Sequence, residues 1–269
     1  MFAHRCPAEV RLLFFLQAFF DESHDEQSER VHGMGGIMAP EEYWRGVWQA
    51  WDAVLDKHHL SYMHWADCVW GHGIFKRLDD PVREEIQRDC LRVIVETDPN
   101  LFVANASVIA MEAYAKFLPR LKVIRKIPPG GPINGTLCDE YFLGFQHSVQ
   151  QMALHPGVPE LPVEETIAFI FDQTEFAPRA YSLFMTLKTM PRLPYAARLG
   201  SCSFDEMKKA KPLQMADALA YEYVRFANDT VINRRPERWQ HRMLQERFGP
   251  GWYFREADIQ EFVTNLEEA

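Results

Sequence analysis

"TIAFIFD", residues 166–172, places five consecutive apolar residues, Ile167 to Phe171, directly before Asp172. A short apolar run of this kind is typical of a central strand that is covered on both faces. Along the chain, such strand-like runs alternate with segments of helical periodicity. The pattern predicts an α/β layered fold, with helices packed on both sides of a sheet.

A second apolar run lies near the start of the chain. Residues 12–20 are dominated by Leu and Phe and lead into Asp21 and Glu22, and residues 31–39 follow a polar turn. Two such runs joined by a turn predict a hairpin of neighbouring strands. The second run contains three glycines, which are uncommon inside strands.

Helix-capping signals and helical periodicity occupy much of the remaining sequence. Helices are predicted over residues 40–59, 80–94, 136–152, 178–190, 212–228 and 255–268, and further strands over 101–110 and 196–204. Residues 233–255 show neither pattern and are predicted to be irregular. We therefore expect one domain over residues 1–232, with a C-terminal extension, 233–269, packed on the same domain.

Composition and charge narrow the function. The 269 residues are 47% hydrophobic and 13% aromatic, which is enough for a substantial core. The formal net charge is −9, so any contact with nucleic acid has to be local. The five cysteines are odd in number and form no CxxC pair, which predicts reduced thiols in a cytoplasmic protein. No apolar stretch reaches the roughly 20 residues that a membrane-spanning helix needs, so we expect no membrane partner.

Three acids stand where the surrounding pattern predicts burial. Asp21 and Asp172 end apolar strands, and Asp217 lies on or beside the apolar stripe of the 212–228 helix. An unpaired buried carboxylate costs several kcal/mol or changes its pKa. If the two strands are neighbours and the helix crosses them, the three acids converge, and Mg²⁺ or Mn²⁺ would relieve their repulsion.

A structural interpretation of the same acids stays open on these grounds. Asp21 and Asp172 could instead cap the turns "DES" and "DQT", and Asp217 could pair with Arg225 or Arg179.

The segments "AFFDES", "IAFIFDQT" and "KPLQMADALAYEYVRF", in this order over residues 14–228, resemble the family called domain of unknown function 3800. That family is grouped with the ribonuclease H-like fold, so the resemblance implies a mixed sheet of that type with helices on both faces. Enzymes of the ribonuclease H-like fold hold two metal ions on acids of the first strand, a central strand and a late helix, so the resemblance implies that Asp21, Asp172 and Asp217 are the matching acids. His24 stands where the family usually has glycine, and His64 matches its histidine-containing segment.

These observations predict a metal-dependent nuclease. Asp21, Asp172 and Asp217 would bind Mg²⁺ or Mn²⁺, a metal-activated water would attack the phosphodiester, and Glu22 or His64 would assist. The alternative is a non-catalytic module of the same fold that binds nucleic acid or a protein partner.

A third hypothesis is a zinc site. His64, Cys68 and His72 recur every four residues, and His59 could add a fourth ligand. Gly71 and Gly73 argue against one continuous helix there.

Basic and aromatic surface candidates complete the predictions. Residues 116–126 and 233–242 are rich in Lys and Arg and could contact a nucleic-acid backbone, with Trp239 available to stack on a base, or could be solvated surface. The stripe of Trp44, Trp48 and Trp51 is interpreted as core packing or as the subunit interface of a homo-oligomer.

Overall fold

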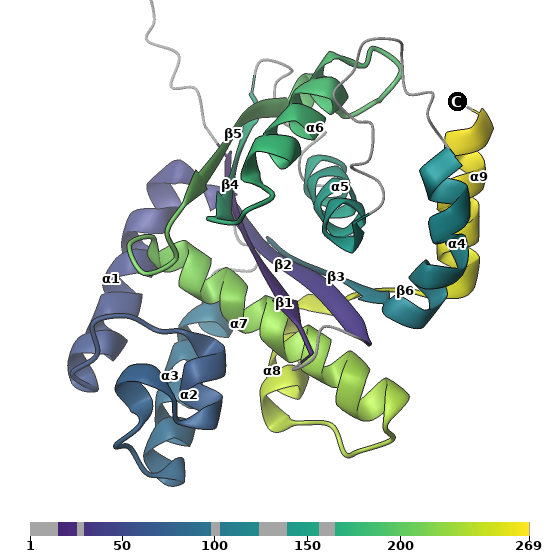
Figure 1. Cartoon of the computed structure of the whole chain (residues 1–269). Helices are drawn as coiled ribbons and strands as arrows, with labels where there is room; N and C mark the ends of the chain where they lie inside the picture. The colour runs from purple at the N-terminus through teal and green to yellow at the C-terminus, as the bar shows by residue number, and fades with distance from the viewer. Residues whose placement is uncertain (1–15, 26–29, 98–102, 124–138, 156–164, 269) are drawn as a thin grey trace, which may run out of the picture.

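The computed structural model describes residues 16–25, 30–97, 103–123, 139–155 and 165–268, and a six-stranded mixed sheet lies at its centre (Figure 1). The strand order is β5-β4-β1-β2-β3-β6. The strands are β1 (Leu16–His24), β2 (Val31–Pro40), β3 (Val103–Ala110), β4 (Ile167–Asp172), β5 (Leu199–Asp205) and β6 (Trp252–Phe254). β2 is antiparallel to β1 and β3, whereas β4 is parallel to β1 and β5, and β6 is parallel to β3. The predicted α/β class and the predicted hairpin are confirmed.

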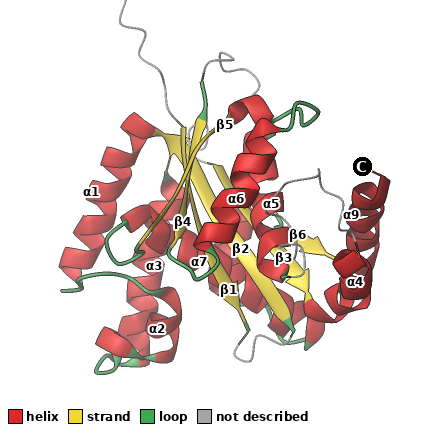
Figure 2. Ribbon diagram, turned by 45° about the horizontal axis from the view of Figure 1, so that its top comes forward, coloured by secondary structure: helices red, strands yellow, loops and turns green. Residues whose placement is uncertain are grey.

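Helices cover both faces of the sheet (Figure 2). They are α1 (Glu41–Lys57), α2 (Trp65–Trp70), α3 (Asp80–Glu96), α4 (Met111–Val123), α5 (Glu140–Ala153), α6 (Ala177–Thr189), α7 (Lys211–Arg225), α8 (Trp239–Phe248) and α9 (Glu256–Glu268). Helices α4, α5, α6 and α9 share one apolar core, and α1, α2, α3, α7 and α8 share the other. Among the described helices, none has the length and apolar character needed to cross a bilayer.

The alternation of side chains along β1 supplies both cores. Phe19 meets Trp44 of α1 edge to face, with ring centroids 4.9 Å apart. Its neighbour Phe20 points to the other face and stacks on Phe171 of β4 at 4.8 Å. Trp44 and Trp51 are buried, which confirms core packing for them, whereas the side chain of Trp48 is 39% exposed.

The glycines of β2 explain how a glycine-rich segment is nevertheless a strand. A Cβ atom added to Gly35 would lie 2.3 Å from the backbone nitrogen of Ala220 and 3.0 Å from the carbonyl oxygen of Ala216, both in α7. On the opposite face, Gly36 leaves room for the ring of Phe20. The missing side chains therefore let α7 pack directly on the backbone of β2.

Two parts of the sequence prediction are wrong. Residues 233–255 are not irregular, because they contain α8 and β6, and β6 pairs with β3. In α8 the buried positions include Gln240 and His241, so apolar periodicity could not reveal the helix. Helix α4 is also absent from the prediction, because Pro119 lies inside it.

Some predicted features lie outside the described residues. They are the proline- and glycine-rich segment 127–135, the start of the 136–152 helix at Thr136, the last three residues of the 116–126 patch, and Cys6 and Cys138.

We predict that Gly35→Ala destabilises the fold. The new methyl group would meet helix backbone, which cannot rotate away, so the free energy of unfolding should fall by about 3 kcal/mol or more in urea denaturation. Gly46→Ala is the matched control, because a Cβ atom there meets nothing within 4 Å and Gly46 lies inside α1. That control should gain about 0.5–1 kcal/mol. Equal stability of the Gly35→Ala protein and the parent would contradict the close packing of α7 on β2.

Candidate functional site

Two of the predicted acids lie side by side at the ends of neighbouring parallel strands. In the register of β1 and β4, Phe20 is paired with Phe171, so the residues that follow them, Asp21 and Asp172, lie at the same level of the sheet. Adjacent strands are only about 4.8 Å apart. The parallel pairing of these two strands therefore brings together two acids that are 151 positions apart in the sequence.

Helix α7 adds the third acid. Asp21 is paired across the hairpin with Gly35, the position at which α7 touches β2. Asp217 follows Ala216 of that contact and is buried, as is Asp21. The charges of Asp217 and Asp172 both act on Asp21. The fold thus places the three acids near enough for their charges to act on one another.

Burial and mutual repulsion raise the pKa values of these acids. The pKa of Asp21 lies well above 3.8, first because the carboxyl is desolvated and then because Asp217 and Asp172 repel its charge. Desolvation raises the pKa of Asp217 to about 6, and the charge of Asp172 adds to the effect. Desolvation also raises the pKa of Asp172. The site therefore disfavours negative charge as long as no cation enters it.

Backbone amides hold the three carboxylates in place. The amide of Glu22 donates to Asp21 over 2.7 Å, and the amide of Met207 donates to Asp172 over 2.7 Å. Asp217 accepts from the amide of Trp65 over 2.6 Å. Each carboxylate thus accepts a hydrogen bond from a neutral backbone amide, which orients the carboxylate without neutralising its charge.

The predicted arginine partners do not neutralise the cluster. Arg179 pairs with Asp139, and Arg225 pairs with Asp229 over 2.9 Å. Within the described residues, the three clustered carboxylates form no ion pair with any Lys or Arg. The interpretation of Asp217 as half of a structural ion pair with either arginine is therefore wrong.

His64 lies next to the acids, at the residue before α2. Its positive charge would lower the pKa values of Asp172 and Asp217. Its Nδ1 atom lies 2.9 Å from the Oδ2 atom of Asp67, and its side chain is 36% exposed. An acid bonded to one ring nitrogen fixes the orientation of the imidazole and leaves Nε2 for exchange with a ligand or solvent.

Gln214 of α7 fixes the two segments that surround the cluster. Its Oε1 atom accepts hydrogen bonds of 2.9 Å from the Met63 amide and from the Trp51 indole. Its Nε2 atom donates to the carbonyl oxygen of Met207 over 3.2 Å. Because Met207 also donates to Asp172, this buried amide couples the histidine-bearing segment to the loop that orients the acid.

Glu22 follows Asp21 in β1 and lines a small pocket beside it. The pocket is lined by Asp21, Glu22, Tyr141 and Asp172 together with apolar side chains of β1, β2 and β4. Desolvation raises the pKa of Glu22 to about 7, although the Thr174 hydroxyl donates to its carboxylate over 3.3 Å.

Sequence reasoning missed several residues of this site. Asp67 could have been found, because it lies three positions after His64 and such a pair meets within one helical turn. Tyr141 gave no signal, since it continues the apolar stripe of α5, and Thr174 and Asp205 lie in or beside turns that any polar residue could occupy. Asp205 is paired with Asp172 in the sheet, and its charge adds to the repulsion there.

The donor set suits a hard divalent cation. Buried carboxylate oxygens with no positive partner are the ligands that Mg²⁺ and Mn²⁺ prefer. Ligand atoms that share one metal ion lie within about 4.8 Å of one another, and the carboxylate oxygens of the three Asp residues do not all meet this spacing. Among the described residues, the group that meets it is His58, Glu85 and Asp89.

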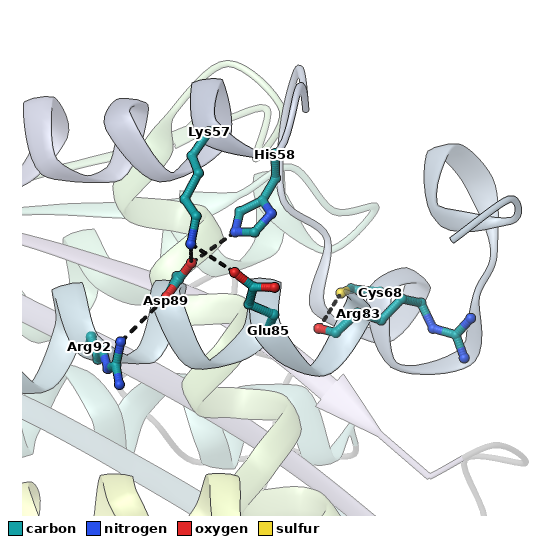
Figure 3. Close-up of polar contacts among 7 residues, drawn as sticks. All are labelled: Lys57, His58, Cys68, Arg83, Glu85, Asp89 and Arg92. Carbon is teal, nitrogen blue, oxygen red and sulfur yellow. Dashed lines mark hydrogen bonds and ion pairs between the residues drawn. The ribbon is translucent and has the colours of Figure 1, made fainter. Parts of the chain in front are cut away.

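The closer group of His58, Glu85 and Asp89 is an ion-pair cluster (Figure 3). Lys57 places its Nζ atom 2.9 Å from Glu85 and 2.6 Å from Asp89, and Arg92 reaches Asp89 at 3.6 Å. The Lys57 ammonium thus already bonds both of the acids that would hold a metal ion there. The cluster is formed between α1 and α3, away from β1 and β4.

The zinc hypothesis fails on geometry. Gly71, in the left-handed conformation, ends α2 before His72, so the three residues do not share one helical face. Cys68 is buried and donates its thiol to the carbonyl oxygen of Arg83 at 3.7 Å (Figure 3), and desolvation raises its pKa to about 12. A thiol in that state is a poor metal ligand.

The predicted basic patches are largely engaged by protein. Lys116 pairs with Glu256 of α9 over 2.8 Å. Arg238 pairs with the buried Glu222 over 3.0 Å, and the Trp239 ring is covered by the guanidinium of Arg88 at 5.0 Å. Lys116, Arg238 and Trp239 are therefore engaged within the protein.

Comparisons of the chain with protein-family models, with curated proteins and with solved structures found no match.

We predict that Asp217→Asn stabilises the metal-free protein. An Asn oxygen can still accept the Trp65 amide, but no charge is buried. Because folding raises the pKa of Asp217 from 3.8 to about 6, the wild-type carboxyl destabilises the fold progressively as the pH rises through that window, and fully above it. Urea unfolding in EDTA should show a gain of roughly 2–3 kcal/mol at about pH 8 that disappears near pH 4.

Asp56→Asn, at an exposed position of α1, is the control for this experiment. It should change stability by less than about 0.5 kcal/mol at either pH. An Asp217→Asn protein that is less stable than wild type near pH 8 would show that this acid is neutralised in the native chain.

Proposed function

We propose that this chain is a metal-dependent phosphodiesterase, acting on nucleic acid, with a ribonuclease H-like sheet. The observation that carries the proposal is the approach of Asp21, Asp172 and Asp217 from the first strand, a parallel neighbour and a late helix. Asp21 and Asp217 are buried, Asp172 is half-buried, and none of the three pairs with a Lys or Arg of the described residues. The strand order supports it, because β1 lies inside the sheet between the antiparallel β2 and the parallel β4. The resemblance to the domain of unknown function 3800 family points to the same three acids.

The carboxylates would hold Mg²⁺ or Mn²⁺. When bound, such an ion neutralises the acids, binds phosphate oxygens and activates water for attack at phosphorus. The chain supplies the rigid frame: Asp21 is set by its strand and by the Glu22 amide, Asp172 by the Met207 amide, and Asp217 by the Trp65 amide. Because those amides belong to three different segments, the ligand oxygens are oriented before the cation arrives.

His64 and Glu22 are the groups that would handle protons. Glu22 is directed into the pocket beside Asp21 and is held by Thr174, so it is placed to accept a proton from the attacking water. His64 stands on the α7 side of the cluster and is oriented by Asp67, so its Nε2 atom can donate to the departing oxygen. The two residues therefore belong to different elements, Glu22 to β1 and His64 to the segment before α2.

We predict that Asp172→Asn removes both metal binding and cleavage. Loss of one ligand charge should weaken the Mn²⁺ affinity in isothermal titration by more than about 100-fold, and cleavage of a labelled oligonucleotide should fall in parallel. Glu85→Gln is the matched control, because it removes a carboxylate from the ion-pair cluster of His58, Glu85 and Asp89. Its Mn²⁺ affinity and cleavage should equal those of wild type.

The opposite pattern, with loss in Glu85→Gln and none in Asp172→Asn, would place the metal at the ion-pair cluster and refute the proposal. A wild-type chain that binds the oligonucleotide but shows neither Mn²⁺ heat nor cleavage would be the non-catalytic module.

We predict that His64→Asn lowers kcat by about 10²–10⁴-fold with little change in KM, as loss of a proton donor does. Asp67→Asn should lower kcat less, because the imidazole stays but loses its orienting carboxylate. His72→Asn, an exposed histidine just beyond α2, is the control and should leave kcat unchanged. Equal kcat values for all three variants would remove His64 from the mechanism.

A further inference from the structure

A pocket of about 320 Å³ lies where the end of α7 meets α8 and β6. Its wall consists of Val108 of β3 and of residues between 223 and 255, a stretch that the structure describes without a gap. Pockets of about 300–1,000 Å³ are the usual sites of small molecules in proteins. Asp217 lies nine residues before Phe226, roughly 13 Å along the helix. The pocket is therefore separate from the acid cluster.

A helical face and an edge strand give the pocket an aromatic and aliphatic wall. A π-helical turn, Phe226–Ile232, continues α7, and its i to i+5 spacing puts Phe226 and Val231 on the face that lines the pocket. Tyr253 of β6 lines the pocket as well and packs against the same apolar core as α7 and α8. Flat rings and methyl groups of this kind suit a flat apolar ligand.

The side of the pocket that residues 250–255 form is held in place by Tyr223. The Tyr223 hydroxyl donates to the carbonyl oxygen of Gly249 over 2.7 Å. A Cβ atom added to Gly251 would lie 2.5 Å from the Tyr223 ring, so only a residue without a side chain lets the two approach this closely. Because the protein makes these contacts by itself, a ligand does not have to order this segment.

His241 of α8 supplies a buried hydrogen-bond acceptor that has no partner. Its Nδ1 atom lies 2.6 Å from the Oε1 atom of Glu237, and its side chain is 2% exposed. A carboxylate can only accept, so the proton of the neutral imidazole is on Nδ1 and Nε2 carries the lone pair. Desolvation lowers the pKa of His241, which favours this neutral form. The Nε2 atom is buried and bonds to nothing among the described residues.

The imidazole cannot turn to find a partner elsewhere. The ring of Phe226 stacks on it, with centroids 4.0 Å apart and planes at 3°, and Tyr223 meets it edge to face at 4.9 Å. Glu237 is outside the lining of the pocket, whereas His241 is part of it. The nitrogen left for a ligand is therefore Nε2, and a buried acceptor of this kind is costly to leave unpaired.

Arg255 provides a positive charge at the mouth of the pocket. The exposed residues of the lining are Pro250, Trp252 and Arg255, so the pocket opens to solvent beside them. The guanidinium of Arg255 forms no ion pair within the described part of the chain, and its charge acts on Tyr253 of the wall. An anionic group of a ligand would find its partner there.

We propose that this pocket binds a small anionic aromatic molecule that carries an O–H or N–H group, which donates to Nε2 of His241 while the anion faces Arg255. Phe226 and Tyr253 would cover the ring. Free aromatic acids and mononucleotides share this chemistry. The inference is independent of the proposed function, because it uses no residue of the acid cluster.

Binding is measured by ligand-observed NMR titration with the full chain in EDTA. The probes are 4-hydroxybenzoate, benzoate, which lacks the donor, phenol, which lacks the carboxylate, and adenosine 5′-monophosphate. The variants are His241→Phe, which keeps a ring against Phe226 but has no acceptor, and Arg255→Gln. Arg45→Gln, at an exposed position of α1, is the matched control. Circular dichroism and urea unfolding verify that each protein is folded.

We expect wild type to bind 4-hydroxybenzoate at least about 5-fold more tightly than benzoate, because only the first satisfies the buried acceptor. His241→Phe should bind the two acids alike. Arg255→Gln should bind both acids about 3-fold more weakly and phenol as wild type does, since an exposed ion pair contributes little. Arg45→Gln should match wild type with every probe.

The comparison of the two acids on wild type requires no variant, so it tests the inference even if His241→Phe does not fold. Equal affinities of wild type for 4-hydroxybenzoate and benzoate would overturn it, and so would a hydroxyl preference that survives in His241→Phe. Binding of adenosine 5′-monophosphate alone, dependent on His241 and Arg255, would support the inference with a nucleotide as the source of the ligand. If no probe binds, the pocket holds only solvent and the inference is wrong.

Discussion

The direct packing of α7 on the backbone of β2 is the constraint on which the acid cluster depends. Layers packed on a sheet normally stand about 10 Å away because side chains fill the space between them. Here Gly35 contributes no side chain and the helix contributes Ala216 and Ala220, so the two backbones touch. Since Gly35 pairs with Asp21, the point of closest approach is also the level of the site. A larger residue at this contact would lift Asp217 away from the other two acids.

The same helix turns buried polar groups toward the segment that bears His64. Gln214 accepts a hydrogen bond from the Met63 amide, and Asp217 accepts one from the Trp65 amide. Glu222 accepts a hydrogen bond of 2.7 Å from the Trp65 indole. Hydrogen bonds of this kind are expensive to leave unmade in an apolar core, so they hold the segment in one conformation. The position of His64 relative to the acids is therefore a consequence of how α7 is packed.

The sequence predicts the helices and strands better than it predicts how they pair and pack with one another. The apolar run of β4, the hairpin of β1 and β2 and the helical stripe of α7 all follow from local periodicity, and so does the idea that Asp21, Asp172 and Asp217 are buried. The parallel pairing of β1 with β4 is a long-range property that no local pattern contains. Helix α8 gives no periodic signal because Gln240 and His241 face inward, where polar residues obscure a helical period. A glycine inside a strand normally lowers the stability of the strand, so the sequence alone does not indicate that Gly35 is the contact point for a helix.

A comparison of the two carboxylate clusters shows why closeness alone does not identify a cation site. His58, Glu85 and Asp89 have donor atoms near enough to share an ion. Lys57 already lies among them, so a metal would have to displace an ammonium that is bonded to both acids. Asp21, Asp172 and Asp217 are farther apart, yet their charge is not balanced by any Lys or Arg of the described chain. The free energy available to a cation comes from that unbalanced charge, because the repulsion it relieves is present before binding. We therefore propose that a cation binds the cluster with raised pKa values, because the carboxylates of the other cluster are already paired with Lys57 and Arg92.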